Sequence, residues 1–288
     1  MIKENNALSL GFSPCPNDTF IFHALVNGLI PVGPLRFARE ILADVETLNE
    51  WAFSGRLDVT KLSFHALGHL TDQYLLLTSG AALGHGCGPL LVAAEPLSAE
   101  ELTQKTIAIP GRFTTAAMLL KLWAPRCRTV VMSFEKIIPG IKEGRVDAGV
   151  IIHESRFTYE QHGLVMIEDL GAWWEAFSGL PIPLGGIAAR RSLGIEAIGH
   201  INECIRASVE LALASPDLPM PYIKKHSQEL DERVIRSHIN LYINDFTKNL
   251  GDEGQNAVAC FLAKGHEAGL FPRPREDFSM RPGKAGNL

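Results

Sequence analysis

The chain has 288 residues, about twice the usual length of a single domain, so one large domain or two lobes are expected. Hydrophobic residues make up 46% and charged residues 20% of the chain, which excludes wholesale disorder and provides for a buried core. The net charge of -5 comes from interleaved acidic and basic residues without a basic tract, so nucleic acid is not an expected partner.

The cysteines and the first residues predict a cytoplasmic protein without a membrane span. The N-terminal segment lacks the basic start and the continuous apolar run of a signal peptide. No apolar run reaches the roughly 18 residues that a membrane span needs. The cysteines form neither a CxxC pair nor a disulfide framework, which is typical of a reducing compartment. They are Cys15, Cys87, Cys127, Cys204 and Cys260.

Strand-like apolar runs alternate with helical patterns in two successive cycles. The first cycle predicts strands and helices in alternation at residues 8–12, 19–27, 35–40, 45–54 and 58–64. The second predicts the same alternation at residues 106–111, 114–123, 128–134, 137–143 and 147–154. This pattern indicates βαβ units, and hence an α/β fold with largely parallel sheets.

The two cycles end alike. Residues 54–66 and 143–155 both contain Gly-Arg-apolar-Asp followed by a strand-like run. Short turns between helices and strands commonly reuse Gly and Asp, so the repeat alone leaves that explanation open. Because each copy closes a βαβαβ cycle, it also favours two similarly built lobes whose strand ends face a shared cleft.

The stretches at residues 88–97 and 180–194 combine strand formers with Gly or Pro and are interpreted as crossovers between lobes. Residues 1–98 and 182–288 are therefore expected to form a larger, discontinuous lobe, and residues 99–181 a smaller inserted lobe. The helical segment 195–262 shows apolar residues at helical spacing and predicts core-facing helices without chemistry. Residues 271–288 are expected to end in a flexible tail.

Polar residues follow the first strand, at Asn17, Asp18 and Thr19. Such residues are favoured helix caps, so capping alone explains Asn17 or Thr19 as well as ligand contact does. Loops at the carboxyl ends of strands are nevertheless where open α/β sheets bind ligands.

A second candidate is the start of the helix at Thr114 and Thr115, which follows Pro110-Gly111. Free amides at a helix N-terminus and Thr hydroxyls can bind a carboxylate or a phosphate, a role that we favour over plain capping. The segment has too few glycines for a P-loop and lacks its Lys-Ser/Thr ending.

The third candidate lies at the end of the strand at residues 58–64. Ser63 could donate to a ligand through its hydroxyl and its amide, and Lys61 could balance an anion, although a lone Lys is usually solvated. His65 and His69 share a helix face but have no third ligand, so zinc is not expected.

His153 follows the matching strand of the second cycle. A His at a strand end in a cleft can titrate near neutral pH and move protons; a structural, hydrogen-bonded His is the alternative. Phe157 stands where a zincin would have its second His, so HESRF is no HExxH motif.

Several long motifs resemble the 1,4-dihydroxy-6-naphthoate synthase family of the futalosine route to menaquinone. In chain order they are SPCPNDTFIFHAL, DVTKLSFHA, GHGCGPLLV, PGRFTTAAMLL, DAGVIIHESRFTY, DLGAWWE and GLPIPLGGIAARR. The resemblance implies a two-lobed fold like that of type II periplasmic binding proteins. It also implies a carbon-carbon lyase that converts cyclic dehypoxanthinyl futalosine into 1,4-dihydroxy-6-naphthoate.

The resemblance further implies roles for individual residues. His153 corresponds to the proton acceptor, and the substrate-contacting positions fall on Lys61, Ser63, Thr115 and Ala116. Asp18 matches a residue that faces the cleft. No metal or redox cofactor is implied, and the expected partner is a small carboxylated substrate. Two alternatives stay open: a non-catalytic protein that binds small anions, and the sister activity, chorismate dehydratase.

Overall fold

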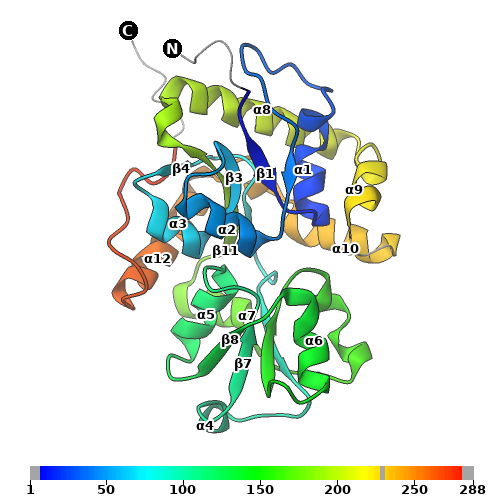
Figure 1. Cartoon of the computed structure of the whole chain (residues 1–288), viewed down its shortest axis with the longest axis vertical. Helices are drawn as coiled ribbons and strands as arrows, with labels where there is room; N and C mark the ends of the chain where they lie inside the picture. Colours follow the sequence, from blue (N-terminus) through cyan, green and yellow to red (C-terminus); the bar gives the residue numbers. More distant parts are fainter. Residues whose placement is uncertain (1–6, 228–230, 281–288) are drawn as a thin grey trace.

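The computed structural model describes residues 7–227 and 231–280, and within them the chain forms two separate sheets (Figure 1). The first sheet has the order β2-β1-β3-β11-β4, with β5 also paired to β11. Its strands are β1 (Leu10–Phe12), β2 (Ile41–Leu42), β3 (Val59–Ser63), β4 (Tyr74–Leu76), β5 (Ala82–Gly84) and β11 (Ile182–Arg190). β1 pairs in parallel with β2 and β3, whereas β11 runs antiparallel to β3, β4 and β5.

The second sheet has the order β10-β6-β9-β7-β8. Its strands are β6 (Leu90–Ala93), β7 (Thr106–Ile109), β8 (Arg128–Val131), β9 (Ala148–Ile151) and β10 (Val165–Asp169). β7 is parallel to β8 and β9, and β6 is antiparallel to β9 and β10. Both sheets are thus mixed, because the crossover strands run back against the parallel strands of the βαβ units.

The helices surround the two sheets. Each sheet with the helices packed on it is called a unit here, and the helices of the second unit lie in the lower part of Figure 1. The helices before β11 are α1 (Pro16–Val26), α2 (Val45–Phe53), α3 (Phe64–Leu70), α4 (Ala99–Leu102), α5 (Thr115–Trp123), α6 (Phe134–Lys142) and α7 (Leu170–Ser178). Those after β11 are α8 (Ile195–Ala214), α9 (Met220–His226), α10 (Glu232–Tyr242), α11 (Asp245–Lys248) and α12 (Gly251–Glu267). Short 3₁₀ helices are η1 (His153–Phe157), η2 (Tyr159–His162) and η3 (Arg191–Leu193).

The two clearest differences from the expected elements lie at α1 and β2. α1 begins at Pro16 and not at Thr19, because the fixed φ of Pro suits a first helical position. The strand expected at residues 35–40 is displaced to β2 at residues 41–42, and only Phe37 forms an isolated bridge, to Leu8. The charged side chains of LRFARE disfavour a place inside the sheet.

The lobe division of residues 1–98 with 182–288 against 99–181 stays a prediction. One boundary needs adjustment, because β6 pairs with β9 and β10 of the second sheet. The chain therefore crosses to the second sheet before Leu90, earlier than the expected change after residue 98. It returns to the first sheet at β11, which begins at Ile182. Of the expected tail at 271–288, residues 281–288 lie outside the described part of the chain.

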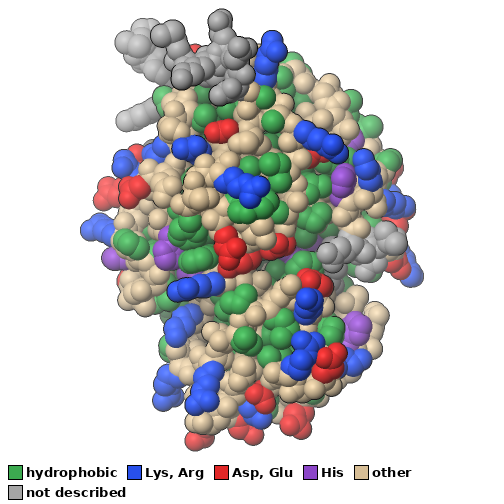
Figure 2. Space-filling model, in the orientation of Figure 1, with side chains coloured by type: hydrophobic (Ala, Val, Ile, Leu, Met, Phe, Trp, Pro, Cys, Tyr) green, Lys and Arg blue, Asp and Glu red, His purple; other side chains and the backbone are tan. Residues whose placement is uncertain are grey.

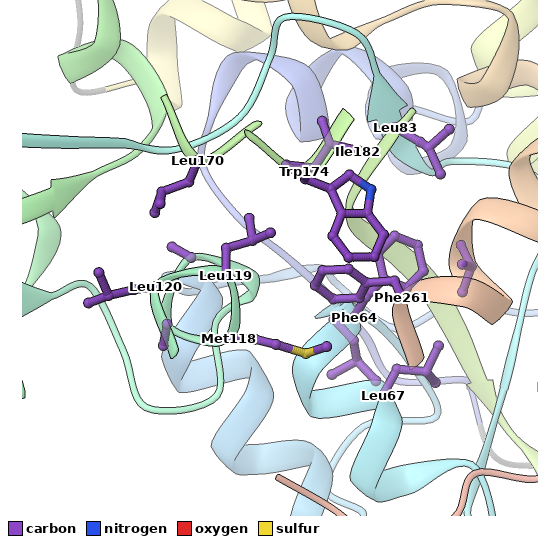
Figure 3. Packing of buried hydrophobic residues seen from close by; sticks show 14 of the residues in the cluster. Phe64, Leu67, Leu83, Met118, Leu119, Leu120, Leu170, Trp174, Ile182 and Phe261 are labelled. Atoms are coloured by element: carbon purple, nitrogen blue, oxygen red, sulfur yellow. The ribbon is translucent and has the colours of Figure 1, made fainter. Parts of the chain in front are cut away.

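One hydrophobic core extends through both units. It combines Leu62 and Phe64 at the end of β3 with Met118 and Leu119 of α5. In Figure 3, Phe64, Met118, Leu119 and Trp174 lie close together with Phe261 of α12. The Trp174 and Phe261 rings meet edge to face, with centroids 5.0 Å apart. The two units are therefore joined by a packed core.

Candidate active site

A cavity of about 90 Å³ lies between the two units. Its wall is formed by the start of α1, the end of β3, the start of α5, the residues after β9, and α10. The candidate residues that line it are Asp18, Lys61, Ser63, Thr114, Thr115, Ala116 and His153. The fold thus gathers these seven candidates in one place, because the strand ends near them face the same cleft. Thr19 does not line the cavity, and its hydroxyl donates to Cys15 O instead.

Asp18 and Lys61 form a buried ion pair in this wall. The Lys61 Nζ donates to Asp18 Oδ1 at 2.5 Å, and the two residues are 5% and 1% exposed. Asp18 also accepts from the amide and the hydroxyl of Ser13 and from Asn17 Nδ2. Lys61 is therefore not a solvated strand-end lysine, and its charge is already balanced within the protein.

Ser63 precedes α3 without a side-chain capping bond and is held by Asn49. The Ser63 amide donates to Asn49 Oδ1 at 2.9 Å, and Asn49 Nδ2 donates to Ser63 Oγ at 3.1 Å. The expectation that the amide serves a ligand is therefore wrong, because that amide is already bonded. The hydroxyl accepts from Asn49, and its own hydrogen takes no part in that bond.

The start of α5 presents amides and not hydroxyls to the cavity. Thr114 Oγ1 accepts from Ala117 N and donates to Gly111 O, so this side chain acts as an ordinary N-cap. Thr115 Oγ1 donates to Leu184 O at 2.5 Å and accepts from Phe64 N at 3.1 Å.

The expected ligand role of these two hydroxyls is thus replaced by structural bonds. In the described part of the chain, the amides of Thr115 and Ala116 have no hydrogen-bond partner. The free amides at the positive end of the helix are suited to bind a carboxylate.

His153 begins η1 directly beyond β9 and lines the cavity. Its φ of 56° is the one positive value among the non-glycine residues that the structure describes. Such a conformation is uncommon for residues with a Cβ and occurs at functional sites. The centroid of the His153 ring lies 5.3 Å from that of Phe134, and the two rings meet edge to face. It lies 6.1 Å from the centroid of the His238 ring, with an angle of 17° between the two ring planes.

His238 was not among the candidates expected from the sequence. α10 presents Ile235, His238, Ile239 and Tyr242 on its buried face, and His238 is 0% exposed. Its Nε2 contacts Asn17 Oδ1 at 2.9 Å, and burial holds the pKa of His238 well below its usual value. The available signal was a polar residue within an apolar helical stripe, which is more informative than the stripe itself.

A second cavity, of about 490 Å³, adjoins the first through Val45 and His153. Four acidic residues line it: Asp44, Glu46, Glu50 and Glu135. Figure 2 shows acidic side chains at the waist of the molecule, near α2 in the orientation of Figure 1. His153 therefore lies where a wide polar cavity meets a narrower, more apolar one.

Glu46 connects the two units beside this opening. Its carboxylate oxygens accept from Phe113 N at 2.9 and 3.1 Å, and burial raises the pKa of Glu46. A Cβ on Gly111 would lie 2.4 Å from Glu46 Cδ, so this approach requires glycine. Glu46 thus fastens the loop before α5 to the first unit.

Within residues 7–227 and 231–280, no three His, Cys, Asp or Glu side chains come together as metal ligands would. No helix in the described part of the chain is long and apolar enough to cross a membrane.

The fold places the chain among two-lobed proteins of the periplasmic-binding-protein kind. An alkanesulfonate-binding protein from Xanthomonas axonopodis pv. citri, bound to MOPS, superposes with a TM-score of 0.73 at 12% identity, covering 97% of this chain and 99% of that one. A Candida albicans protein described as having the generic periplasmic binding protein fold superposes with a TM-score of 0.65 at 12% identity, covering 95% of this chain and 93% of that one. The expected fold class is confirmed.

The sequence comparisons are more specific. The family described as menaquinone biosynthesis matches residues 8–267. A 1,4-dihydroxy-6-naphthoate synthase from Thermus thermophilus is 51% identical over 94% of this chain and 99% of its own. A second synthase of this name, from Streptomyces coelicolor, is 43% identical over 93% of this chain and 95% of its own. A solved protein from Archaeoglobus fulgidus superposes with a TM-score of 0.88 at 35% identity, covering 93% and 100%. The chain is an enzyme of the menaquinone biosynthesis family, in the branch of the 1,4-dihydroxy-6-naphthoate synthases.

Proposed function

We propose that this enzyme converts cyclic dehypoxanthinyl futalosine into 1,4-dihydroxy-6-naphthoate by breaking a carbon-carbon bond. The observation that carries the proposal is the position of His153, which lies at a strand end where the two cavities meet. The near full-length identity to synthases of this name supports the choice of substrate.

His153 acts in this proposal as the general base. It takes a proton from a carbon beside a carbonyl group of the substrate, and the electron pair left behind forms a carbon-carbon double bond while the scissile carbon-carbon bond breaks. The departing fragment keeps the electron pair of the broken bond and takes up a proton, which the protonated His153 can return. Formation of an aromatic product makes the fragmentation favourable. His153 stands at the start of η1, and the contact of its ring with Phe134 fixes the direction from which the proton is taken.

The free amides of Thr115 and Ala116 bind the carboxylate of the substrate, and the Ser63 hydroxyl adds one donor. These groups are held in place before the substrate binds, which is the condition for efficient electrostatic stabilisation. Lys61 lines this wall with its charge balanced by Asp18. Asp18 and Thr114 hold this wall of the cavity in place through their hydrogen bonds to Lys61 and to Ala117.

We further propose that the protein works in the cytoplasm on a small carboxylated molecule, without nucleic acid. All five cysteines are free thiols, which fits a reducing compartment. The alternatives of a non-catalytic binding protein and of a chorismate dehydratase are less favoured, because the relatives with high identity are synthases.

The direct test is incubation of the purified protein with cyclic dehypoxanthinyl futalosine, while the absorption of the naphthoate product is followed. A parallel incubation with chorismate provides the control for the sister activity. Naphthoate from the first mixture alone supports the proposal. Turnover of chorismate alone, or binding of the first compound without any product, would overturn it.

A further inference from the structure

A chain of buried polar groups leads from Lys61 to His238. Lys61 Nζ donates to Asp18 Oδ1, and Asn17 Nδ2 donates to the same oxygen at 3.0 Å. Asn17 Oδ1 in turn contacts His238 Nε2 at 2.9 Å. Asn17, Asp18, Lys61 and His238 all line the inner cavity.

This chain fixes the tautomer of His238. A carboxylate accepts hydrogen bonds and does not donate them, so the Asn17 amide must turn its NH₂ group toward Asp18. The Asn17 oxygen then faces His238, and an amide oxygen can only accept. His238 Nε2 therefore carries the hydrogen. Because burial, followed by the charges of His153 and Lys61, lowers the pKa of His238, the ring stays neutral and Nδ1 keeps its lone pair.

The Nδ1 atom of His238 is buried and has no hydrogen-bond partner among residues 7–227 and 231–280. Unsatisfied buried acceptors are rare and destabilising, and each one calls for an explanation. The ring lies beside two others, with its centroid 6.1 Å from that of His153 and 4.6 Å from that of Tyr242. His238 also lines the inner cavity, so a ligand group that enters there can approach the ring.

We propose that His238 determines specificity in the inner cavity, with its Nδ1 lone pair accepting a hydrogen bond from a hydroxyl group of the substrate. The inference rests on the proposed function and adds a group to it. The α5 amides select a carboxylate, whereas a neutral lone pair repels an anion and selects an uncharged donor. The two subsites together orient the substrate with respect to His153.

Two substitutions separate this role from a structural one. In His238→Asn, the amide oxygen can occupy the place of Nδ1, while the bond to Asn17 is lost. In His238→Gln, the amide nitrogen can keep the bond to Asn17, while the acceptor near Nδ1 is lost. A purely structural His238 predicts that His238→Gln is the milder change, and a substrate acceptor predicts the opposite.

The experiment compares kcat/KM for cyclic dehypoxanthinyl futalosine with kcat/KM for analogues that each lack one hydroxyl group. The ratio of these two kcat/KM values does not depend on the fraction of the protein that folds, because both values scale with the concentration of folded enzyme. In the wild type and in His238→Asn, one analogue is expected to be poorer by about 10-fold or more, and in His238→Gln that preference is expected to fall to about 1.

A wild-type enzyme with no preference for any hydroxyl would overturn the inference and leave the proposed function intact. The same holds for a preference that His238→Gln retains in full. An absence of turnover of the parent compound by the wild-type enzyme would instead overturn the proposed function, and this inference with it.

Discussion

The Lys61 ammonium lies 2.5 Å from Oδ1 of Asp18, and neither side chain is in appreciable contact with solvent. The pair joins the end of β3 to the first turn of α1 across the wall of the inner cavity. Both residues were identified as candidates for ligand contact, yet each is the other's main partner. Their contribution to the site is therefore a fixed electrostatic environment.

Replacement of Asp18 by Asn is expected to lower the free energy of unfolding by about 3–5 kcal/mol, because it leaves the buried Lys61 charge without a counter-ion. Urea unfolding of the two proteins measures the change. Glu203→Gln is the matched control, since it breaks the exposed ion pair of Glu203 with Arg206 and should cost at most about 1 kcal/mol. Equal costs for Asp18→Asn and this control would contradict the buried pair.

Thr115→Val is expected to reduce stability more than substrate affinity. The change leaves Phe64 N and Leu184 O without their partner and should cost about 1–3 kcal/mol of unfolding free energy. The amide of residue 115 is retained, so substrate binding by the folded protein should change little. Thr115→Ser keeps the hydroxyl and provides the control. Unchanged stability together with a large loss of affinity would restore the hydroxyl as a ligand contact.

His65 should make the fold sensitive to mild acid. Burial lowers its pKa to about 4, and the ring bonds to Thr114 O and faces His69 and Arg112. Between this value and the ordinary 6.5, the unfolded chain binds more protons than the native protein, so stability falls as the pH drops through that window.

Across this window, the shifted pKa of His65 changes the free energy of unfolding by about 3 kcal/mol. Urea unfolding at pH 7 and at pH 4 should therefore show a smaller loss of stability in His65→Asn than in the wild type by about that amount. Identical pH dependence in the two proteins would show that His65 does not titrate as expected.

The shared core should make the two units unfold together. Leu119 on α5 is fully buried in a cluster that also contains Phe64 and Trp174. Leu119→Ala should therefore lower the free energy of unfolding by about 2–5 kcal/mol. Calorimetry should still show a single unfolding transition in the wild type and in the variant. Two separate heat-absorption peaks in the wild type would contradict a continuous core between the units.

The alternation of strand and helix patterns was enough to predict the α/β class and the strand ends at which candidate residues would meet. Lys61, Ser63 and His153 do lie in one cavity, because the ends of β3 and β9 face each other between the sheets. This success depends on local patterns, since period and turn residues determine where a strand stops.

Long-range pairing lay beyond the sequence. The partners of Thr115 Oγ1 are 51 and 69 positions away, and Asn17 meets His238 at a separation of 221. No local pattern encodes such contacts. The membership of β6 in the second sheet has the same cause, because a short apolar run fits either sheet until its neighbours are known.

The most direct test of the central claim, that His153 is the base in this cavity, is the turnover of His153→Asn across pH 6 to 8. Asn tolerates the positive φ of this position and retains a polar side chain without a titratable nitrogen, so folding should persist. Turnover of cyclic dehypoxanthinyl futalosine should fall by about 100- to 10,000-fold. A folded variant with turnover close to that of the wild type would contradict the assignment.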